Sequence, residues 1–151
     1  MDDVRISRAA RTDLPELLAL LAAVDLPHEG VEEYLDGFMV ARDAEGRLIG
    51  GIGLERHGGV GLLRSAAVAP DAQGSGLGLR LTSALLEAVR SDGVEEVVLL
   101  TATAEQFFGR KFGFEVAGRD AYAEALARSP EWNLPRCSSA VIMRLRLGRP
   151  I

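Results

Sequence analysis

Cysteine is almost absent from this chain, since Cys137 is the only one among 151 residues. One thiol cannot form an internal disulfide, and it cannot supply a metal site built on cysteines. No apolar run approaches the length of a membrane span, and the opening Met1-Asp2-Asp3 does not resemble a secretion signal. We therefore expect a cytoplasmic protein that has neither a membrane anchor nor a bound metal.

Positive charge is also scarce, because 17 Lys and Arg residues face 22 Asp and Glu residues and the net charge is -5. The basic residues are scattered, and the isoelectric point is about 5.1. This balance argues against non-specific binding of nucleic acid. A hydrophobic content of 48% with 26% charged residues is ordinary for a globular protein, and the length predicts one domain over residues 1–151.

Glycine, in contrast, is concentrated in the stretch around which the chain is organised. An apolar strand runs up to Val68, Pro70 interrupts it, and an amphipathic helix is expected over 77–90. Gly74, Gly76 and Gly78 lie between them, at the helix start. Glycine lets backbone N–H groups converge on a ligand, and a helix N-terminus adds unpaired donors. The natural ligand of such a loop is an anion, most often a phosphate.

Three other interpretations of this loop can be compared with the spacing. A P-loop ends in Gly-Lys-Ser/Thr, which is missing here. A dinucleotide fingerprint needs Gly-x-Gly-x-x-Gly and an acid at the end of the next strand, whereas the glycines follow Gly-x-Gly-x-Gly and that strand ends in Thr101-Ala102-Thr103. The third interpretation, a turn that binds no ligand, is also compatible with these residues.

The remaining pattern predicts strands and helices in alternation. Asp13, followed by Pro15 and Glu16, reads as the cap of an apolar helix that ends at Leu26-Pro27. Strands are expected over 4–7, 38–42, 47–56, 96–101 and 138–147, with another opening at Gly113-Phe114, and further helices over 31–36, 105–111 and 120–128. This order indicates an α/β (α+β) fold.

One known loop fits the glycine spacing. Gln73-Gly74-Ser75-Gly76-Leu77-Gly78 matches Gln/Arg-x-x-Gly-x-Gly/Ala and resembles the acyl-CoA pyrophosphate loop of the GNAT superfamily of N-acetyltransferases. The element order is also similar to that of GNAT proteins over nearly the whole chain. The resemblance implies a single GNAT-like domain whose mixed central sheet, flanked by helices, splays between the fourth and fifth strands, near Ala66–Val68 and Leu99–Thr101.

The same resemblance implies acetyl-CoA as the cosubstrate. Its pyrophosphate would lie on the N–H groups of Gln73 to Leu79, and its pantetheine would pair with the backbone of Ala66 and Val68. The N–H of Val68 would polarise the thioester carbonyl. The residues expected to contact the cofactor are Ala66, Val68, Gln73, Gly74, Ser75, Gly76, Leu77, Gly78, Leu79, Thr101 and Phe108.

A second GNAT landmark is incomplete. GNAT proteins often carry Asn-x-x-Ala-x-x-Phe-Tyr followed by Gly-Phe, and here the stretch from Thr101 to Phe108 and Gly113-Phe114 match most of it. Phe108 stands at the tyrosine position, or Gly109 does when the count runs back from Gly113. The usual tyrosine acid is therefore missing, and Tyr122 is one alternative source of a proton. Phe107 and Phe108 read as core residues or as cofactor contacts.

At a finer level the chain resembles the GNAT group linked to arsenic resistance, some members of which acetylate the amino group of arsinothricin. The stretches that carry this resemblance are residues 26–37, Gly53-Leu54-Glu55-Arg56, Gly61-Leu62-Leu63-Arg64-Ser65 and residues 99–108. These are subgroup patterns and include no catalytic motif. Cys137 reads as a small core or loop residue, with an arsenic-binding thiolate as the alternative.

Acetyl transfer to an amine needs a group that removes a proton from the ammonium form. Glu55, at a strand end, is the expected base, and a solvated acid is the alternative. Arg64 lies inside an apolar strand, so it needs an anionic partner, either a substrate carboxylate or an acid such as Glu55. His28 and His57 occupy glycine-flanked loops and titrate near neutral pH. Of these, Glu55, Arg64 and His28 are the expected substrate contacts.

The sequence thus predicts an acetyl-CoA-dependent N-acetyltransferase that acts directly on a small, amino-acid-like amine. A non-catalytic acyl-CoA sensor and a peptide or protein N-acetyltransferase remain alternatives, as does an unrelated nucleotide binder. Nucleic acid and membrane are not expected as partners. A homodimer is an assembly still to be tested.

Overall fold

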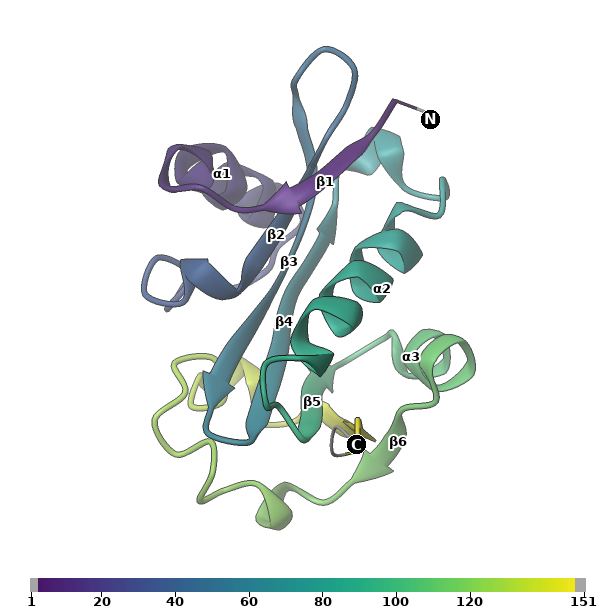
Figure 1. Cartoon of the computed structure of the whole chain (residues 1–151). Helices are drawn as coiled ribbons and strands as arrows, with labels where there is room; N and C mark the ends of the chain where they lie inside the picture. The colour runs from purple at the N-terminus through teal and green to yellow at the C-terminus, as the bar shows by residue number, and fades with distance from the viewer. Residues whose placement is uncertain (1–2, 149–151) are drawn as a thin grey trace. The chain divides into compact units, whose positions relative to one another are not determined.

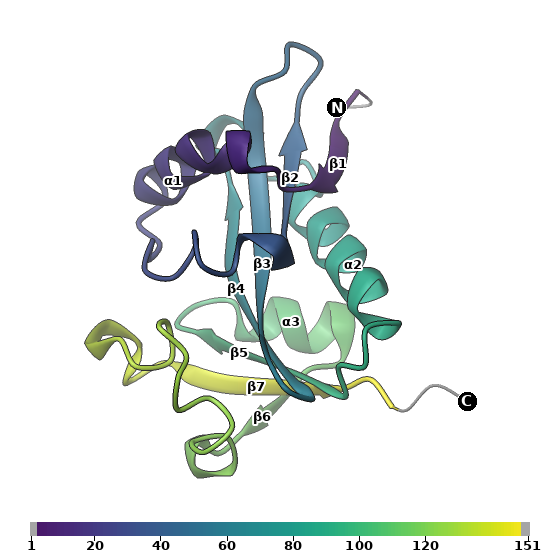
Figure 2. The same ribbon diagram turned by 60° about the vertical axis from the view of Figure 1, so that its left-hand side comes forward.

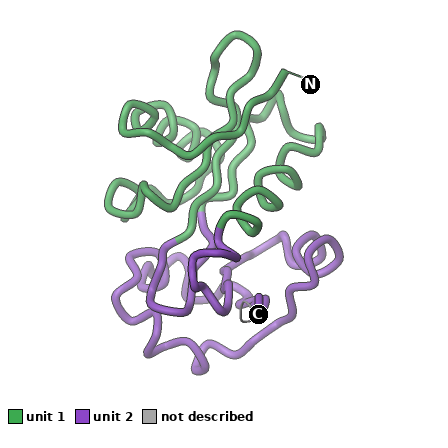
Figure 3. Tube along the Cα trace, viewed as in Figure 1, with its two compact units in different colours: residues 1–54, 65–88 green, residues 55–64, 89–151 purple. Residues whose placement is uncertain are grey.

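The computed structural model describes residues 3–148, which form two compact units (Figure 3). Residues up to Leu54 and from Ser65 to Ala88 form the first unit, and Glu55–Arg64 with the chain from Val89 onward form the second. The strands are β1 (Arg5–Arg8), β2 (Phe38–Arg42), β3 (Leu48–His57), β4 (Val60–Val68), β5 (Glu96–Thr101), β6 (Glu115–Ala117) and β7 (Val141–Arg146). The α-helices are α1 (Leu14–Ala23), α2 (Leu77–Arg90) and α3 (Glu105–Phe112).

The strands follow the order β1-β2-β3-β4-β5-β7-β6 in a seven-stranded sheet. Strands β4 and β5 are parallel, whereas β1–β2, β2–β3, β5–β7 and β6–β7 are antiparallel. A mixed α/β sheet flanked by helices is therefore confirmed. The β4–β5 ladder extends from Val60↔Glu96 to Leu63↔Leu99. Separation of the later parts of these two strands involves both units and stays a prediction.

In the first unit, helices cover both faces of β3 (Figures 1 and 2). A Cβ added to Gly50 would lie 2.8 Å from Leu81 of α2, and one added to Gly51 would lie 2.8 Å from Leu17 of α1. Successive strand residues point to opposite faces, so these two contacts place α1 and α2 on opposite sides. Glycine at both positions lets the leucines approach the strand closely, and Leu17 and Leu81 are buried.

In the second unit, β5, β6 and β7 support an apolar cluster that includes part of β4. Its buried members are Leu62, Val98, Tyr122, Leu126, Trp132 and Ile142. Helix α3 contributes an aromatic group in which Phe108 contacts Phe107, Phe112 and Phe114, with ring centroids 5.1–6.5 Å apart. The segment between β6 and β7 has no α-helix or strand, and this packing holds it in place.

Three local predictions were wrong. Residues 31–36 form turns that lead into a 3-10 helix, Leu35–Gly37, and residues 120–128 form turns after the 3-10 helix Arg119–Ala121. Both segments are too short to be helical through intrinsic propensity, and tertiary packing decides their conformation. Asp13 precedes α1 but does not cap it, because its carboxylate accepts hydrogen bonds from the Ala10 N–H and from Arg42.

None of the helices among residues 3–148 is both long enough and apolar enough to span a membrane.

Gly37, just before β2, is a position where any side chain should destabilise the first unit. A Cβ there would overlap the backbone carbonyl oxygen of Leu54, which cannot rotate away. We expect Gly37→Ala to lower the free energy of unfolding by about 1–3 kcal/mol, measured by urea titration. Gly118→Ala is the control, because no heavy atom lies within 4 Å of its added Cβ. Equal stability of the two variants would contradict the structure.

Candidate functional site

The glycine loop joins β4 to α2 within the first unit. After the 3-10 helix Pro70–Ala72, the exposed residues Gln73 to Gly76 lead directly into Leu77, the first residue of α2. Gly74 and Gly76 have φ values of 83° and 84°, which residues with a side chain rarely adopt. No heavy atom lies within 4 Å of a Cβ built at either glycine, so the backbone there is open.

Two side chains of this loop stabilise it through hydrogen bonds to nearby backbone carbonyls. Gln73 Nε2 donates to the Val68 carbonyl at 3.1 Å, and Ser75 Oγ donates to the Ala72 carbonyl at 2.6 Å. Backbone N–H groups near two left-handed glycines at a helix N-terminus form a cradle that fits an anion. Leu77 is buried, Gly78 lies beside Val68, and Leu79 is exposed. The residues present therefore fit a phosphate-bearing ligand.

An unusual backbone conformation lies in β4. Ser65 is buried and has a φ of 60°, although it is not a glycine. Such a residue costs about 1–3 kcal/mol and persists only where the surrounding structure enforces it. It stands between Arg64 and Ala66, at the start of the segment expected to bind pantetheine. Nothing in the sequence indicated it, because serine gives no signal for a positive φ.

Thr101 and Phe108 have structural partners. Thr101 Oγ1 accepts a hydrogen bond from the Ala104 N–H at 2.8 Å, which shapes the turn before α3. Phe108 is buried among aromatic rings, so the core interpretation of this residue is confirmed. Their contacts with a cofactor stay predictions.

The hydroxyl of Tyr122 donates to Glu96 Oε1 at 3.0 Å. Burial of the phenol raises the pKa of Tyr122. Its proton is therefore engaged in a structural contact near the start of β5, and its pKa shift makes the group a weaker acid. These two facts disfavour Tyr122 as a substitute for the missing tyrosine.

A buried ionic cluster in the second unit contains two of the predicted substrate residues. Arg64 Nη1 donates to Glu55 Oε2 at 2.7 Å, and neither side chain has any exposed surface. Glu55 Oε1 accepts from Ser129 Oγ at 2.5 Å and lies 3.0 Å from His57 Nε2. Since an ionised carboxylate can only accept, the His57 Nε2–H is the donor. The pairing of Arg64 with Glu55 is confirmed, and the substrate clamp stays a prediction.

Glu131 belongs to the same cluster and was missed by the sequence reasoning. Its Oε2 lies 3.6 Å from Arg64 Nε, is buried, and has no hydrogen-bond partner among the described residues. Burial raises the pKa of Glu131 to about 7; the nearby Arg64 opposes this rise and Glu55 adds to it. An acid in a Ser-Pro-Glu-Trp turn gives no local signal, because only tertiary packing brings it to Arg64.

The other candidate residues are less enclosed or less reactive. His28 lies in the first unit, its side chain is 77% exposed, and its Nε2 is 3.7 Å from Glu29. Burial, which is the main cause, and the charge of Glu131 raise the pKa of the Cys137 thiol, so a thiolate is disfavoured. No group of three or more potential metal ligands occurs between residues 3 and 148.

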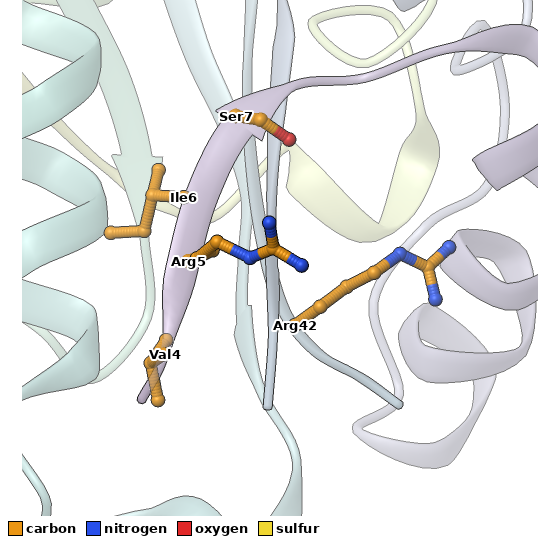
Figure 4. Close-up of a pocket in the computed structure, with 5 residues that line it drawn as sticks. All are labelled: Val4, Arg5, Ile6, Ser7 and Arg42. Atoms are coloured by element: carbon orange, nitrogen blue, oxygen red, sulfur yellow. The ribbon is translucent and has the colours of Figure 1, made fainter. Parts of the chain in front are cut away.

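A cavity of about 470 Å³ opens at the edge of the first unit, next to β1 (Figure 4). It is lined by Val4, Arg5, Ile6, Ser7 and Arg42. Arg42 is already paired with Asp13 and Glu16, at 2.6 and 2.9 Å. None of the predicted site residues lines this cavity.

Comparison with known proteins agrees with this geometry. The sequence model of the Acetyltransferase (GNAT) domain matches residues 35–116. Mycothiol acetyltransferase from Saccharomonospora viridis is 41% identical over an alignment of 98 residues, and the match covers 56% of this chain and 32% of that protein. The chain thus spans about a third of the length of the curated relatives that it matches.

Solved structures show the same fold. N-acetylglutamate synthase from Neisseria gonorrhoeae, complexed with coenzyme A and L-arginine, has a TM-score of 0.77 and 26% identity, covering 97% of this chain and 34% of that one. Rv2747 from Mycobacterium tuberculosis, in complex with CoA, also has a TM-score of 0.77, with 24% identity over 94% of this chain and 98% of that one.

The Arg64–Glu55 pair yields a test of the cluster. Arg64→Met would leave the Glu55 carboxylate buried without its guanidinium, so we expect a loss of about 3–5 kcal/mol in the free energy of unfolding. Adding Glu55→Gln should restore part of this loss, because the buried charge is then removed. Arg47→Met, which breaks an exposed pair with Asp71, is the control and should cost less than about 1 kcal/mol. An Arg64→Met protein of wild-type stability would instead favour the substrate clamp.

The raised pKa of Glu131 yields a second test. Between about pH 4.5 and 7 the folded protein keeps a proton on Glu131 that the unfolded chain has lost, so this group lowers the free energy of unfolding as the pH rises. Glu131→Gln should remove the decline, and its stability advantage over wild type should grow by about 3 kcal/mol across this range. Urea unfolding at several pH values measures it, with the exposed Glu124→Gln as control. A difference that does not change with pH would disprove the shift.

Proposed function

The chain belongs to the GNAT acetyltransferase family, and from this premise we propose that it transfers the acetyl group of acetyl-CoA directly to the amino group of a small molecule. The observation that carries the proposal is the open glycine loop before α2, with Gly74 and Gly76 both at positive φ. A CoA pyrophosphate is the anion that this family membership associates with such a loop. The CoA in the structures of similar proteins supports the assignment.

The proposed cofactor site uses backbone groups more than side chains. The N–H groups from Gln73 to Leu79 would hold the pyrophosphate, and those of Ala66 and Val68 would pair with the pantetheine arm. The Val68 N–H would polarise the thioester carbonyl, where negative charge develops during attack. Thr101, the last residue of β5, and Phe108 of α3 are further proposed cofactor contacts.

Departure of the thiol needs no tyrosine in this scheme. A free thiol has a pKa of about 8.5, so its anion is a tolerable leaving group near neutral pH. Glu55 was the expected base, and its carboxylate already receives hydrogen bonds from Arg64 and Ser129 and the Nε2–H of His57. These three contacts disfavour Glu55 as the group that takes the proton of the acceptor amine.

The acceptor that we propose is a small amine with an amino-acid-like skeleton. The names of two similar proteins, mycothiol acetyltransferase and N-acetylglutamate synthase, are compatible with a small-molecule acceptor. The resemblance to the arsenic-resistance group points to the same class, with arsinothricin as one member of the panel to be tested. A cytoplasmic location and a homodimer remain parts of this proposal.

A non-catalytic acyl-CoA sensor is the second candidate. It is favoured by the absence of tyrosine from the segment 101–109 and by the engagement of the Tyr122 hydroxyl with Glu96. A sensor would bind acetyl-CoA but would not release its thiol, whereas an enzyme would do both. A peptide N-acetyltransferase would prefer peptide amines over free amino acids.

We expect Gly76→Glu to weaken acetyl-CoA binding by orders of magnitude, because it places bulk and negative charge in the anion cradle. Gly46→Glu is a matched control, since Gly46 has a similar φ of 81° and open surroundings, and lies in the β2–β3 hairpin. Isothermal calorimetry measures the affinity. Equal affinity of the two folded variants would remove the loop from the site.

The same proteins should then be tested for turnover. Release of free CoA thiol is followed with free amino acids, arsinothricin and short peptides as acceptors. Turnover by the wild type and Gly46→Glu, but not by Gly76→Glu, supports the enzyme. Binding by the wild type without thiol release on any amine supports the sensor.

A further inference from the structure

The buried cluster in the second unit contains more negative than positive charge. Glu55 and Glu131 share one guanidinium, that of Arg64, at 2.7 and 3.6 Å. With both carboxylates ionised and His57 neutral, the group carries one net negative charge in the interior. Burial of an uncompensated charge is expensive. A proton or a further cation would neutralise these groups.

The two carboxylates differ in how they are hydrogen-bonded. Glu55 receives three donors, from Arg64, Ser129 and His57. Glu131 Oε2 accepts no hydrogen bond from any residue between 3 and 148, although the residue is only 7% exposed. A buried acceptor left without a donor costs about 1–3 kcal/mol. A donor from outside the chain would remove this penalty at Glu131 and not at Glu55.

The accessible part of the cluster is also at Glu131. The side chains of Arg64 and Glu55 have no exposed surface, whereas those of Glu131 and His57 are 10% and 9% exposed. Glu131 belongs to the turns between Ser129 and Cys137, which are tied to the cluster through Ser129 Oγ: it donates to Glu55 and accepts from the Trp132 N–H. Of the two acids, Glu131 is thus the one with exposed side-chain surface, although its Oε2 atom is itself buried.

The charged and titratable groups around Glu131 come from several elements. Glu55 and His57 belong to β3, and Arg64 belongs to β4. The Cys137 thiol is close enough for Glu131 to raise its pKa, and Arg136 and Arg119 also act on that thiol. Arg119 donates to the Cys137 carbonyl at 2.8 Å and lies over the Trp132 ring.

We propose that Glu131, and not Glu55, is the ammonium-binding and proton-accepting residue for the acceptor amine. The ammonium N–H would donate to Oε2, and its positive charge would make the cluster neutral with both carboxylates ionised. The preferred acceptor is thus a primary amine that is protonated in solution. This inference rests on the proposed acetyl transfer, and it assigns the acceptor side of the reaction.

The proton balance of the step is simple. Glu131 takes one proton from the ammonium group and leaves a neutral amine with a lone pair. A nitrogen–carbon bond forms at the thioester carbonyl, the carbon–sulfur bond breaks, and the second proton of the nitrogen goes to the departing thiolate. Glu131 then returns its proton to water, so one proton is released for each amide formed.

The pKa of about 7 for Glu131 suits this role, because a general base works best when its pKa lies near the working pH. Arg64, whose Nε lies 3.6 Å from Glu131 Oε2, precedes Ala66 by two residues in the sequence.

Kinetics with the intact protein provide the first test. Glu131→Gln should leave acetyl-CoA affinity unchanged and lower kcat/KM for the acceptor by about 10²–10⁴-fold. The ionisation near pH 7 should also disappear from its pH profile. Glu131→Asp keeps a carboxylate and should recover part of the rate, and the exposed Glu124→Gln should behave as wild type. A Glu131→Gln protein with wild-type kcat/KM and pH profile would overturn the proposal.

A second measurement does not depend on turnover. Infrared difference spectra should show a protonated carboxyl band that disappears as the pH rises through about 7 in the wild type and is missing from Glu131→Gln. Methylammonium, used as the probe, should move this transition to lower pH, because a bound cation stabilises the carboxylate. A transition that saturating methylammonium leaves in place would overturn ammonium binding.

Together, the kinetic and the infrared experiments distinguish a failure of this inference from a failure of the proposed function. Gly76→Glu should lose acetyl-CoA binding and turnover but keep the methylammonium response. If the wild type binds acetyl-CoA without turnover on any amine, the transferase proposal and the proton-accepting step both fail. The infrared result then decides ammonium binding by itself.

Discussion

The ion pair between Arg64 and Glu55 is the constraint on which the second unit depends. A guanidinium without exposed surface must have an anionic partner, and the β3–β4 hairpin supplies one nine residues away. Ser129 extends the pair by donating to the same carboxylate and accepting from the Trp132 N–H. The segment between β6 and β7 has few regular elements, so these polar contacts and the packing of Trp132 hold its path. A buried charge thereby organises a loop.

The first unit differs from the second, because its proposed anion site lies at the surface and is formed by backbone N–H groups without charged side chains. Its loop consists of two glycines at positive φ and the start of α2. The side chains of Gln73 and Ser75 donate hydrogen bonds to nearby backbone carbonyls and so stabilise the loop. Strain at Ser65 lies in the strand that leads to this loop. Residues held in such conformations are enriched at functional sites. The proposed cofactor site is thus mainly a property of the backbone.

This difference explains what the sequence could predict. Glycine spacing and helical periodicity are local signals, so α2 and β5 were predicted with their observed bounds, Leu77–Arg90 and Glu96–Thr101. The need of Arg64 for an anion was also visible, because the residue interrupts an apolar strand. Residues 120–128 looked helical but form turns, since Tyr122 and Leu126 are drawn into the core. The role of Glu131 could not be predicted, because it depends on a contact with Arg64, which is 67 positions earlier in the chain.

The family match includes some residues of the proposed sites and leaves out others. Residues 35–116 include Glu55, Arg64 and the whole glycine loop, but neither Ser129 nor Glu131. The matched part of this chain thus contains the glycine loop and one buried ion pair. The later turns add an acid that leaves this pair with an unbalanced negative charge and an acceptor atom without a donor. A cofactor held by backbone groups can stay the same while such a loop varies, because the loop changes no residue of the cradle. Acceptor choice would then depend on the charge that residues 129–137 bring to Arg64, and a neutral residue at position 131 would remove the preference for a cationic amine.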